Sequence, residues 1–491
     1  MASITVVIPF EQQNQFSNTL RQFSQSSLVE KIYVVHAGGF ERTDPKVECV
    51  KSTTFANGAT VSQILSNTVT DHLLVVSQRG EIELGHGALE RLVDVAAESG
   101  AGIAYSDCYA VKNGLKTEHS LIDYQLGSVR DNFDFGALML LSCKPVKYAI
   151  TKYGLSPDVQ WSGWYDLRLK ISIDANIFHL QEFLYSKSEF DEGKAESTMF
   201  DYLDPRNTGV QKELENVFTQ HLKNVGAYLP PHFDDVPEPV GTFPVQASVV
   251  IPVRNRVHTI ADAIKSALRQ KTDFDFNVIV VDNHSTDGTS EVIEQLSRHE
   301  KRIVRVVPEK TGLSIGGCWN EAIASRRCGR YSVQLDSDDL YAGTDTLQTL
   351  TNMFRNDSYA AVIGSYKLVD LALKEIPPGV IDHREWTPEN GRNNALRVNG
   401  FGAPRAFCTH LVRELRFPNV SYGEDYAVCL ALSRKYRIGR IFDPMYLCRR
   451  WEGNTDARLT LEQANKNNFY KDRIRTVEIL ARQKINRKED E

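Results

Sequence analysis

The sequence lacks the features that would place it in a membrane, in an oxidising compartment or on nucleic acid. No stretch approaches the roughly eighteen uninterrupted apolar residues of a membrane-spanning helix. The opening residues enter a strand-like run directly, without the cationic and apolar parts of a secretory signal. The 8 cysteines are scattered and form no C-x-x-C pair, which favours reduced thiols over disulfides or zinc ligands. A net charge of -6 without a basic stripe argues against nucleic-acid binding. We therefore expect a soluble cytoplasmic protein.

The composition is typical of a globular protein with more than one domain. Apolar residues make up 42% and charged residues 24% of the 491 positions, and this length corresponds to about two to four domains. Apolar strand-like runs at 4–10, 31–35, 72–76 and 102–105 alternate with helical patterns such as 88–99. Such alternation predicts an α/β fold with a mostly parallel sheet covered on both faces.

The chain contains an internal duplication on either side of a proline-rich segment. Residues 228–246 hold five prolines, which resist helix and sheet and indicate a semi-rigid linker. Directly afterwards, residues 248–253 repeat the pattern of residues 5–10. Further pairs recur at one spacing of 259, among them Asp425 with Asp166. We predict two tandem units, 1–227 and 247–455, the linker 228–246, and a helical tail, 456–491.

The two copies differ at the end of the strand that precedes residue 336. The second copy has Asp336-Ser337-Asp338, where the first has Ser77-Gln78-Arg79. Nearby carboxylates repel one another unless a cation joins them, and oxygen-rich sites suit Mg²⁺ or Mn²⁺. The alternative is a solvated acidic turn. Since the first copy is expected to fold without these acids, we interpret them as functional.

Other segments of the second copy are each ambiguous. Residues 252–256, with arginines after a strand, suit an anion at a helix start or are a solvated loop. The glycine-rich run from Gly312 to Asn320 indicates phosphate binding or plain flexibility. Acids at 424–425 suit a helix cap or catalysis, and residues 449–451 suit diphosphate binding or a surface Arg–Trp stack. After the second strand, Asp287 or Thr286 is expected to cap a helix.

Taken together, and in this order, these motifs resemble the family 2 glycosyltransferases with a GT-A fold. The tandem arrangement is similar to that of two-domain bacterial polysaccharide synthases, with a degenerate first unit. The resemblance implies two GT-A-like units followed by a C-terminal helix. Leu447 stands where processive synthases have the glutamine of Gln-x-x-Arg-Trp, which leaves processive or single addition open.

The resemblance also implies roles for individual residues. Asp425 would be the general base that takes a proton from the acceptor, and Asp336 and Asp338 would bind Mn²⁺ or Mg²⁺. Asp282 would contact the nucleotide base. The remaining donor-binding positions would be Pro252, Arg254, Asn255, Gly312, Asn320, Ser337 and Arg450.

The function implied is an inverting, metal-dependent transfer of a sugar from a nucleotide-diphosphate sugar. A UDP-sugar is favoured, and the acceptor would be a hydroxyl of a glycan, a lipid-linked or another molecule in surface polysaccharide or glycoconjugate synthesis. A non-catalytic sugar- or nucleotide-binding scaffold and a sugar nucleotidyltransferase remain alternatives. Ile474, Val477, Ile479 and Leu480 would pack one face of a docking helix in the tail. Peripheral contact with the inner face of a membrane and homo-oligomer formation stay open.

Overall fold

The computed structural model describes residues 2–10, 14–42, 44–77, 80–188, 207–454 and 459–489. The chain forms two compact units. Unit 1 comprises Met1–Tyr228 and Thr460–Glu491, and unit 2 comprises Leu229–Leu459. Gln78 and Arg79, which were compared with the acids of the second copy, lie outside the described residues.

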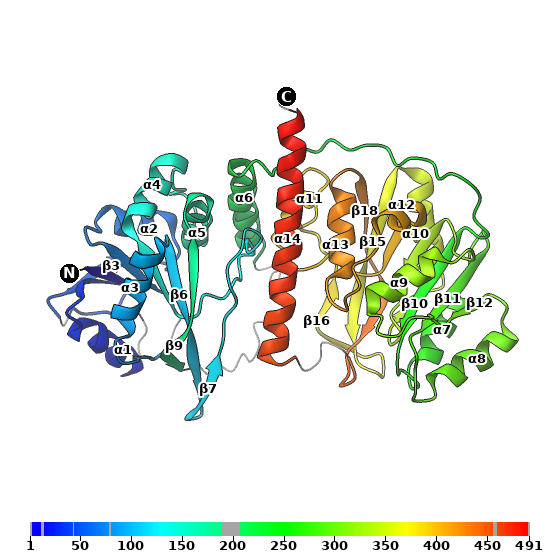
Figure 1. Cartoon of the computed structure of the whole chain (residues 1–491), viewed down its shortest axis with the longest axis horizontal. Coiled ribbons are helices and arrows are strands. Elements are labelled where there is room, and N and C mark those ends of the chain that lie inside the picture. The colour runs from blue at the N-terminus through cyan, green and yellow to red at the C-terminus, as the bar shows by residue number, and fades with distance from the viewer. Residues whose placement is uncertain are drawn as a thin grey trace. The chain divides into compact units, whose positions relative to one another are not determined.

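Unit 1 alternates strands and helices along most of its length (Figure 1). Its strands are β1 (Ile4–Pro9), β2 (Val29–His36), β3 (Val47–Lys51), β4 (His72–Val76), β5 (Ile82–Leu84), β6 (Ile103–Lys112), β7 (Leu115–His119), β8 (Leu138–Ser142) and β9 (Ile177–Ser188). Its helices are α1 (Asn14–Gln25), α2 (Gly58–Ser66), α3 (Ala88–Ser99), α4 (Cys143–Tyr153), α5 (Gly163–Asp174), α6 (Thr208–Asn224) and α14 (Leu461–Glu489).

Unit 2 has the same alternation. Its strands are β10 (Ala247–Val253), β11 (Phe276–Asp282), β12 (Ile303–Val306), β13 (Tyr331–Gln334), β14 (Leu340–Tyr341), β15 (Tyr359–Val369), β16 (Glu375–Ile381), β17 (Arg405–Cys408) and β18 (Arg437–Arg449). Its helices are α7 (Ile260–Leu268), α8 (Thr289–His299), α9 (Ile315–Ala324), α10 (Thr346–Asn356), α11 (Gly391–Asn394), α12 (Thr409–Leu415) and α13 (Glu424–Ser433).

The two sheets have one topology. Among the described residues, unit 1 has a 9-stranded sheet in the order β3-β2-β1-β4-β8-β6-β9-β5, with β7 beside β6. Unit 2 has the order β12-β11-β10-β13-β17-β15-β18-β14, with β16 beside β15, so every strand of one unit has a counterpart in the other. Registers agree as well, since Val7 pairs with Val75 in unit 1 and Val250 with Gln334 in unit 2. Shared order and register support the duplication inferred from the sequence.

The expected α/β class is confirmed, although each sheet is mixed rather than mostly parallel. β1 to β4 pair in parallel, whereas β8 runs antiparallel to both of its neighbours. The same reversal occurs at β17 in unit 2. Sequence patterns show that a strand is buried but not its direction, because direction depends on pairing between distant segments.

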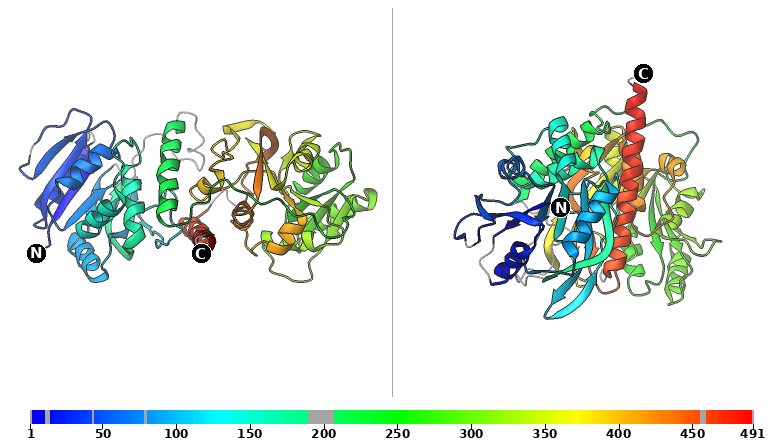
Figure 2. Two further views of the ribbon diagram at one scale, coloured as in Figure 1. Left: turned by 90° about the horizontal axis from the view of Figure 1, so that it is seen from above. Right: turned by 60° about the vertical axis from the view of Figure 1, so that its left-hand side comes forward.

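Both faces of the unit 1 sheet are covered by helices (Figure 2). Side chains of one face, such as Val6 and Leu74, pack with α1 and α3 in one core. Side chains of the other face, such as Val7 and Leu73, pack with α2, α4 and α5. Because successive residues of a strand point to opposite faces, the continuous apolar runs in the sequence are explained by burial on both sides.

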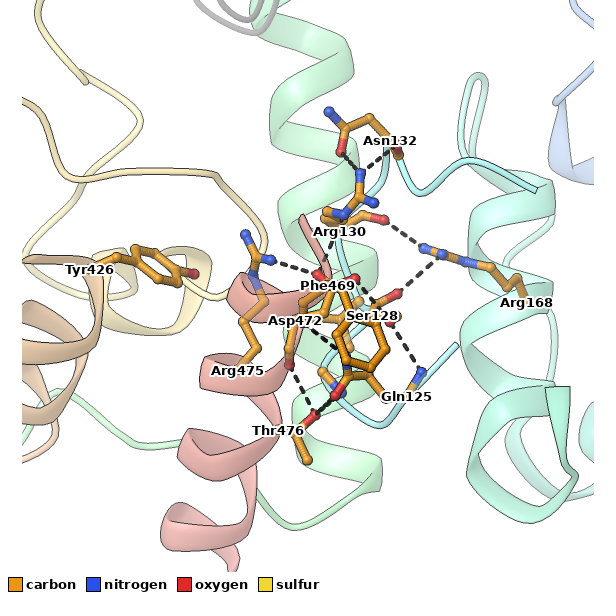
Figure 3. Close-up of polar contacts among 12 residues, drawn as sticks. Gln125, Ser128, Arg130, Asn132, Arg168, Tyr426, Phe469, Asp472, Arg475 and Thr476 are labelled. Carbon is orange, nitrogen blue, oxygen red and sulfur yellow. Dashed lines mark hydrogen bonds and ion pairs between the residues drawn. The ribbon is translucent and has the colours of Figure 1, made fainter. Parts of the chain in front are cut away.

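α14 is held by unit 1 through polar contacts of the loop between β7 and β8 (Figure 3). The buried carboxylate of Asp472 accepts a hydrogen bond from the Ser128 hydroxyl at 3.0 Å and pairs with Arg475 at 2.7 Å and Arg130 at 3.4 Å. The backbone at Gly127 approaches the helix so closely that a side chain there would meet the Asp472 carbonyl. Polar anchoring therefore fixes the tail helix on unit 1.

The prediction that α14 packs through an apolar face is wrong in part. Val477 is 60% and Leu480 is 52% exposed, whereas Ile479 is buried and Ile474 is partly buried. The buried positions Asp472 and Arg475 are charged, so an apolar pattern could not identify the side of α14 that packs.

The proline-rich segment runs along unit 2. The Asn393 side chain accepts a hydrogen bond from the Leu229 amide at 3.1 Å and donates one to the Leu229 carbonyl at 2.9 Å. Arg392 donates to the carbonyls of Pro230 and His232. These contacts attach the segment to unit 2 over its first residues.

No helix among the described residues has the length and apolar character needed to cross a membrane.

Candidate functional site

The carboxyl ends of neighbouring strands in unit 2 gather the candidate residues at one edge of the sheet. Val253 at the end of β10 pairs with Asp282 at the end of β11, and Val250 pairs with Gln334 at the end of β13. Asp336 follows two residues later. Open α/β sheets bind ligands at this edge, so the topology places these side chains where a ligand is expected.

Asp336 and Asp339 are braced by neighbouring side chains. Gln334 donates its amide hydrogens toward both carboxylate oxygens of Asp336, at 3.0 Å each. The Tyr446 hydroxyl accepts the Asp336 amide at 3.0 Å. The buried Asp339 carboxylate accepts the backbone amide of Arg449 at 2.7 Å, so Asp339 supports the turn from the inside.

Asp338 is the acid contacted by the segment that follows β18. One of its carboxylate oxygens accepts hydrogen bonds from the Trp451 indole at 3.3 Å and the Asn454 amide at 3.2 Å. The Arg256 guanidinium, from the loop after β10, lies 3.7 Å from the same oxygen. Arg449 donates to the Asp338 backbone carbonyl. Three separate segments thus meet at this acid.

The cluster carries negative charge that its protein neighbours do not fully neutralise. Desolvation raises the pKa of Asp336, and the nearby charges of Asp338 and Asp425 raise it further. Burial, followed by the charges of Asp336 and Asp338, raises the pKa of Asp339 well above its usual range. Elevated carboxyl pKa values in a group of acids are the electrostatic condition that a bound cation relieves.

The donor set fits a hard divalent cation that also binds a phosphate-bearing ligand. No group of three or more His, Cys, Asp or Glu side chains within the described residues could hold a metal ion by itself. Mg²⁺ is usually bound by one or two carboxylates together with water and substrate phosphates. Asp336 and Asp338 supply such a partial set, and oxygens of a diphosphate would complete it.

Asp425 lies at the start of α13 and faces the same region. Its carboxylate pairs with the Arg405 guanidinium of β17 at 2.6 Å and is 26% exposed, so solvent or a substrate can reach it. Its neighbour Glu424 is buried, and one of its oxygens has no hydrogen-bond partner among the described residues. Burial, with the Asp425 charge beside it, raises the pKa of Glu424 to about 8.

Asp282 is buried and organises the loop after β11. Its carboxylate accepts the Ser285 amide at 3.1 Å and the Ser290 hydroxyl at 2.5 Å, and pairs with Arg305 at 3.1 Å. Burial alone would raise the pKa of Asp282, but these hydrogen bonds outweigh it and lower the pKa. Contact with a nucleotide base stays a prediction, because the described contacts give Asp282 a structural role of its own.

The loop after β10 lies beside the loop after β11. Asn255, with a φ of 55°, accepts the Thr286 amide on its side-chain oxygen at 2.8 Å. The Arg254 side chain is exposed, and Pro252 pairs with Val281 within the sheet. The N-cap of α8 is Gly288 rather than the predicted Asp287 or Thr286, although the Asp287 carboxylate accepts the Thr289 amide at 3.0 Å.

The glycine-rich segment has a packing explanation. A side chain at Gly316 would collide with the Pro418 carbonyl, and the Gly316 amide donates to the Val420 carbonyl at 3.0 Å. The Asn320 side chain both donates to and accepts from the Phe417 backbone, at 2.8 and 2.9 Å. Gly312 has a φ of 77°, which favours glycine. These contacts account for Gly316 and Asn320 without a ligand, and donor binding by Gly312 and Asn320 remains untested.

Arg449, the neighbour of the predicted Arg450, lies at the acid cluster. Arg449 is buried, and its guanidinium contacts the Asp338 carbonyl and the Asp262 carboxylate, the latter at 3.3 Å. One of its terminal nitrogens is buried without a hydrogen-bond partner among the described residues. The Arg450 amide donates to the Val369 carbonyl at 2.7 Å. A donor-binding role for Arg450 and for the buried Ser337 stays a prediction.

Sequence reasoning missed Gln334 and Arg405, which link the acids to one another. A signal was present in the duplication, because their counterparts in the first copy are the apolar Val75 and Met139. The register confirms this correspondence, since Val75 pairs with Met139 and Gln334 lies beside Arg405. Polar residues that appear in only one copy of a duplicated strand mark the edge where the copies differ in chemistry.

A family model matches part of unit 2. Residues 248–409 match the model of Glycosyl transferase family 2. This segment of unit 2 is therefore similar to glycosyl transferase family 2. The resemblance inferred from the motifs is therefore confirmed, together with the GT-A-like α/β architecture. The matched residues run from the start of β10 to the beginning of α12 and include Asp282, Asp336 and Asp338.

The chain is similar to several bacterial transferases over part of its length. It is 24% identical to the poly(ribitol-phosphate) beta-glucosyltransferase of Bacillus spizizenii over 42% of this chain and 33% of that protein. It is 29% identical to the putative teichuronic acid biosynthesis glycosyltransferase TuaG of Bacillus subtilis, over 38% of this chain and 72% of that protein. It is 25% identical to the UDP-Glc:alpha-D-GlcNAc-diphosphoundecaprenol beta-1,3-glucosyltransferase WfgD of Escherichia coli, over 40% of this chain and 72% of that protein. The chain spans about a third of the length of the first of these relatives.

Solved structures also match in part. TarS of S. aureus, residues 1-349 in complex with UDP-GlcNAc, is 22% identical with a TM-score of 0.37, covering 48% of this chain and 72% of that one. The mannosyltransferase PcManGT of Pyrobaculum calidifontis, in complex with GDP-Man and Mn2+, is 16% identical with a TM-score of 0.34. The match covers 56% of this chain and 84% of that one.

Proposed function

We propose that unit 2 transfers a sugar from a nucleotide-diphosphate sugar, with a UDP-sugar favoured, to an acceptor hydroxyl, in a metal-dependent reaction that inverts the anomeric centre. The observation that carries the proposal is the meeting of two kinds of acid at one sheet edge. Asp336 and Asp338 suit a cation and a diphosphate, while Asp425 is partly exposed and free of the cluster's hydrogen bonds to Gln334 and Trp451. The family model that matches residues 248–409 and the named transferases among the relatives support this assignment.

The roles follow from the chemistry of the bond that breaks. Negative charge grows on the departing diphosphate, and a divalent ion held by Asp336 and Asp338 would stabilise that charge. The guanidiniums of Arg256 and Arg449 lie at the same acid and are placed to face phosphate oxygens. Asp425 takes the proton from the acceptor hydroxyl, which is a poor nucleophile until a carboxylate accepts its proton. One base opposite the leaving group corresponds to a single displacement with inversion.

For unit 1 we propose a degenerate transferase unit without donor turnover. Ser77 occupies the place of Asp336, and its hydroxyl donates to the Gly136 carbonyl at 3.1 Å. His36 occupies the place of Asp282 and packs with Phe10 and Phe40, at ring distances of 6.5 and 6.0 Å. Aromatic side chains thus fill the region between the ends of β1 and β2, and this supports a binding or structural role for unit 1, such as holding an acceptor or a partner.

The relatives suggest surface polymers as the setting. Two of them carry names of cell-wall polymer synthesis, and one is named for a lipid-linked acceptor and UDP-Glc. We extend to this chain the class of reaction and a UDP-sugar donor. The acceptor class is a hydroxyl-bearing glycan or lipid-linked glycan.

The test is release of UDP from UDP-glucose and from UDP-N-acetylglucosamine, with and without Mn²⁺, by the full chain. We expect Mn²⁺-dependent release that falls by about 100-fold or more in Asp425→Asn, in the range of general base catalysis. The matched control is Asp166→Asn, the same change at the equivalent position of unit 1, which should leave the rate unchanged. Near-normal release by Asp425→Asn would refute the base assignment, and release by neither donor would refute the UDP-sugar proposal.

A further inference from the structure

A largely buried guanidinium lies near both the acceptor-side acid and the donor-side acid of unit 2. Arg405 pairs with Asp425 at 2.6 Å, and its side chain is only 14% exposed. Its second terminal nitrogen donates to the Gly402 carbonyl at 2.9 Å, which fixes the plane of the guanidinium. Burial alone would lower the pKa of Arg405, but the surrounding acids, Asp425 first, outweigh that effect and raise the pKa above its usual range. This cation therefore faces several acids at once.

Gln334 joins the same arginine to the proposed metal ligand. Its side-chain amide donates to both oxygens of Asp336, and its side-chain oxygen accepts the Arg405 backbone amide at 3.3 Å. The Gln334 backbone carbonyl in turn accepts the buried Tyr341 hydroxyl at 2.9 Å. A continuous chain of contacts thus runs from Asp336 through Gln334 and Arg405 to Asp425.

Unit 1 shows how the same fold treats the corresponding acid when the chain of contacts is missing. Its equivalent of Arg405 is Met139. Asp166, the equivalent of Asp425, is buried and pairs with Lys170 of its own helix at 2.7 Å, and it accepts the Ser156 amide at 3.1 Å. The position of Lys170 is Cys429 in unit 2. The two units therefore neutralise the same acid from different elements: from within α5 in unit 1, and across from β17 in unit 2.

The difference has a consequence for chemistry. A lysine four residues along the same helix neutralises the acid but fixes it only to its own helix. An arginine from the sheet fixes the carboxylate relative to β13 and the turn that holds Asp336, and its planar fork constrains direction as well as charge. Folding alone is satisfied by either arrangement, as unit 1 demonstrates. The arrangement of unit 2 is the one that relates the acid to the donor site.

We infer that Arg405 is a positioning residue for the proposed transfer reaction: it holds Asp425 aimed at the acceptor, in fixed relation to the donor bound at Asp336. Gln334 transmits that relation. The inference rests on the proposed function of unit 2. It assigns no contact between Arg405 and the substrates, so its loss should change turnover far more than donor affinity.

The variant that tests the inference is Arg405→Met, which installs the residue of unit 1. With UDP-glucose or UDP-N-acetylglucosamine, whichever the wild-type chain hydrolyses faster, we expect kcat to fall about 100-fold, in the range of a misplaced general base. The dissociation constant of UDP with Mn²⁺, measured by calorimetry, should change less than about threefold. Arg405→Lys, which keeps the charge but not the planar fork, should recover only part of the rate.

The second readout is the pH dependence of turnover. Around Asp425, the charged and titratable groups are Glu424 and Cys429 on its own helix, Asp336 from the β13 turn, and Arg405 from β17. Arg440, on β18, also acts on Cys429. Removing Arg405 leaves the acids facing one another, so the acid limb of the kcat profile should move about one pH unit or more to higher pH. A merely structural role would not move this limb.

A double variant separates charge from position. Arg405→Met with Cys429→Lys recreates the pairing of unit 1, so we expect it to restore the thermal stability lost in Arg405→Met while leaving kcat low. Restored kcat in the double variant would overturn the inference, because charge neutralisation would then suffice. A kcat within threefold of wild type in Arg405→Met would overturn it as well.

Failure of the inference and failure of the proposed function give different results. Absence of UDP release by the wild-type chain, or wild-type release by Asp425→Asn, contradicts the proposed function. Active wild type, inactive Asp425→Asn and active Arg405→Met contradict the positioning role alone.

Discussion

Glu424 gives unit 2 a pH dependence that can be derived from its surroundings. The carboxyl is buried at the first turn of α13 beside Asp425, and its pKa rises from 4.5 to about 8. The unfolded chain ionises this group above pH 4.5, whereas the folded chain keeps it protonated until about pH 8. The folded state therefore binds an extra proton in this interval, and unfolding becomes easier as the pH rises through it.

The magnitude follows from the size of the pKa change. At about 1.4 kcal/mol for each pKa unit, keeping Glu424 buried costs about 5 kcal/mol once the pH exceeds 8. Glutamine is close in shape and cannot ionise, so Glu424→Gln removes this cost. Relative to wild type, the variant should gain about 2–3 kcal/mol of stability between pH 6 and pH 8.

Hydrogen exchange of peptides from 424–433, measured by mass spectrometry and corrected for intrinsic rates, reports this difference locally. Glu424→Gln should increase protection of α13 at pH 8 much more than at pH 6. Glu291→Gln is the matched control, because Glu291 also lies in the first turn of a helix but is exposed. An equal change at both pH values, or reduced protection at pH 8, would refute the claim that the fold holds Glu424 neutral.

Two further variants test other parts of the structure. Asp472→Asn should destabilise unit 1 by about 3 kcal/mol, since it leaves Arg130 and Arg475 buried without their shared carboxylate. Urea unfolding of this variant, compared with the exposed control Asp94→Asn, measures the loss. A loss of stability below about 1 kcal/mol would contradict the prediction. Asp282→Asn should weaken UDP binding by about tenfold. The loop that Asp282 holds through charge-assisted hydrogen bonds would lose about 1.4 kcal/mol of preorganisation. Unchanged UDP affinity in calorimetry would show that this loop does not form the nucleotide pocket.

Local sequence patterns predicted the strands and helices whose formation depends on residues close together in the chain. The apolar runs at β1, β2 and β4 and the helical spacing at α3 lie where the sequence placed them. The duplication was visible because equivalent residues recur at nearly fixed spacing. The antiparallel direction of β8 and β17 was not visible, because it arises from pairing across more than sixty residues in each unit, as for His72 with Ser142.

The site was predictable to the extent that acids stand at strand ends. Asp336 and Asp338 were chosen for that reason, whereas Asp425, at the start of a helix, was chosen because of the family resemblance. Gln334 and Arg405 were missed because a polar residue inside a strand has no meaning until its partner across the sheet is known. For α14, an apolar pattern suggested the packed side, whereas the structure anchors the helix through a buried carboxylate.

The central claim is that Asp336 and Asp338 bind a divalent ion together with a nucleotide diphosphate in unit 2. Calorimetric titration of the full chain with UDP, in the presence and absence of Mn²⁺, tests it most directly. Mn²⁺ should tighten UDP binding by about tenfold or more in the wild-type chain, and Asp338→Asn should abolish that gain. Asp273→Asn, at an exposed acid paired with Arg355, should retain it. An equal Mn²⁺ effect in Asp338→Asn and wild type would contradict the account.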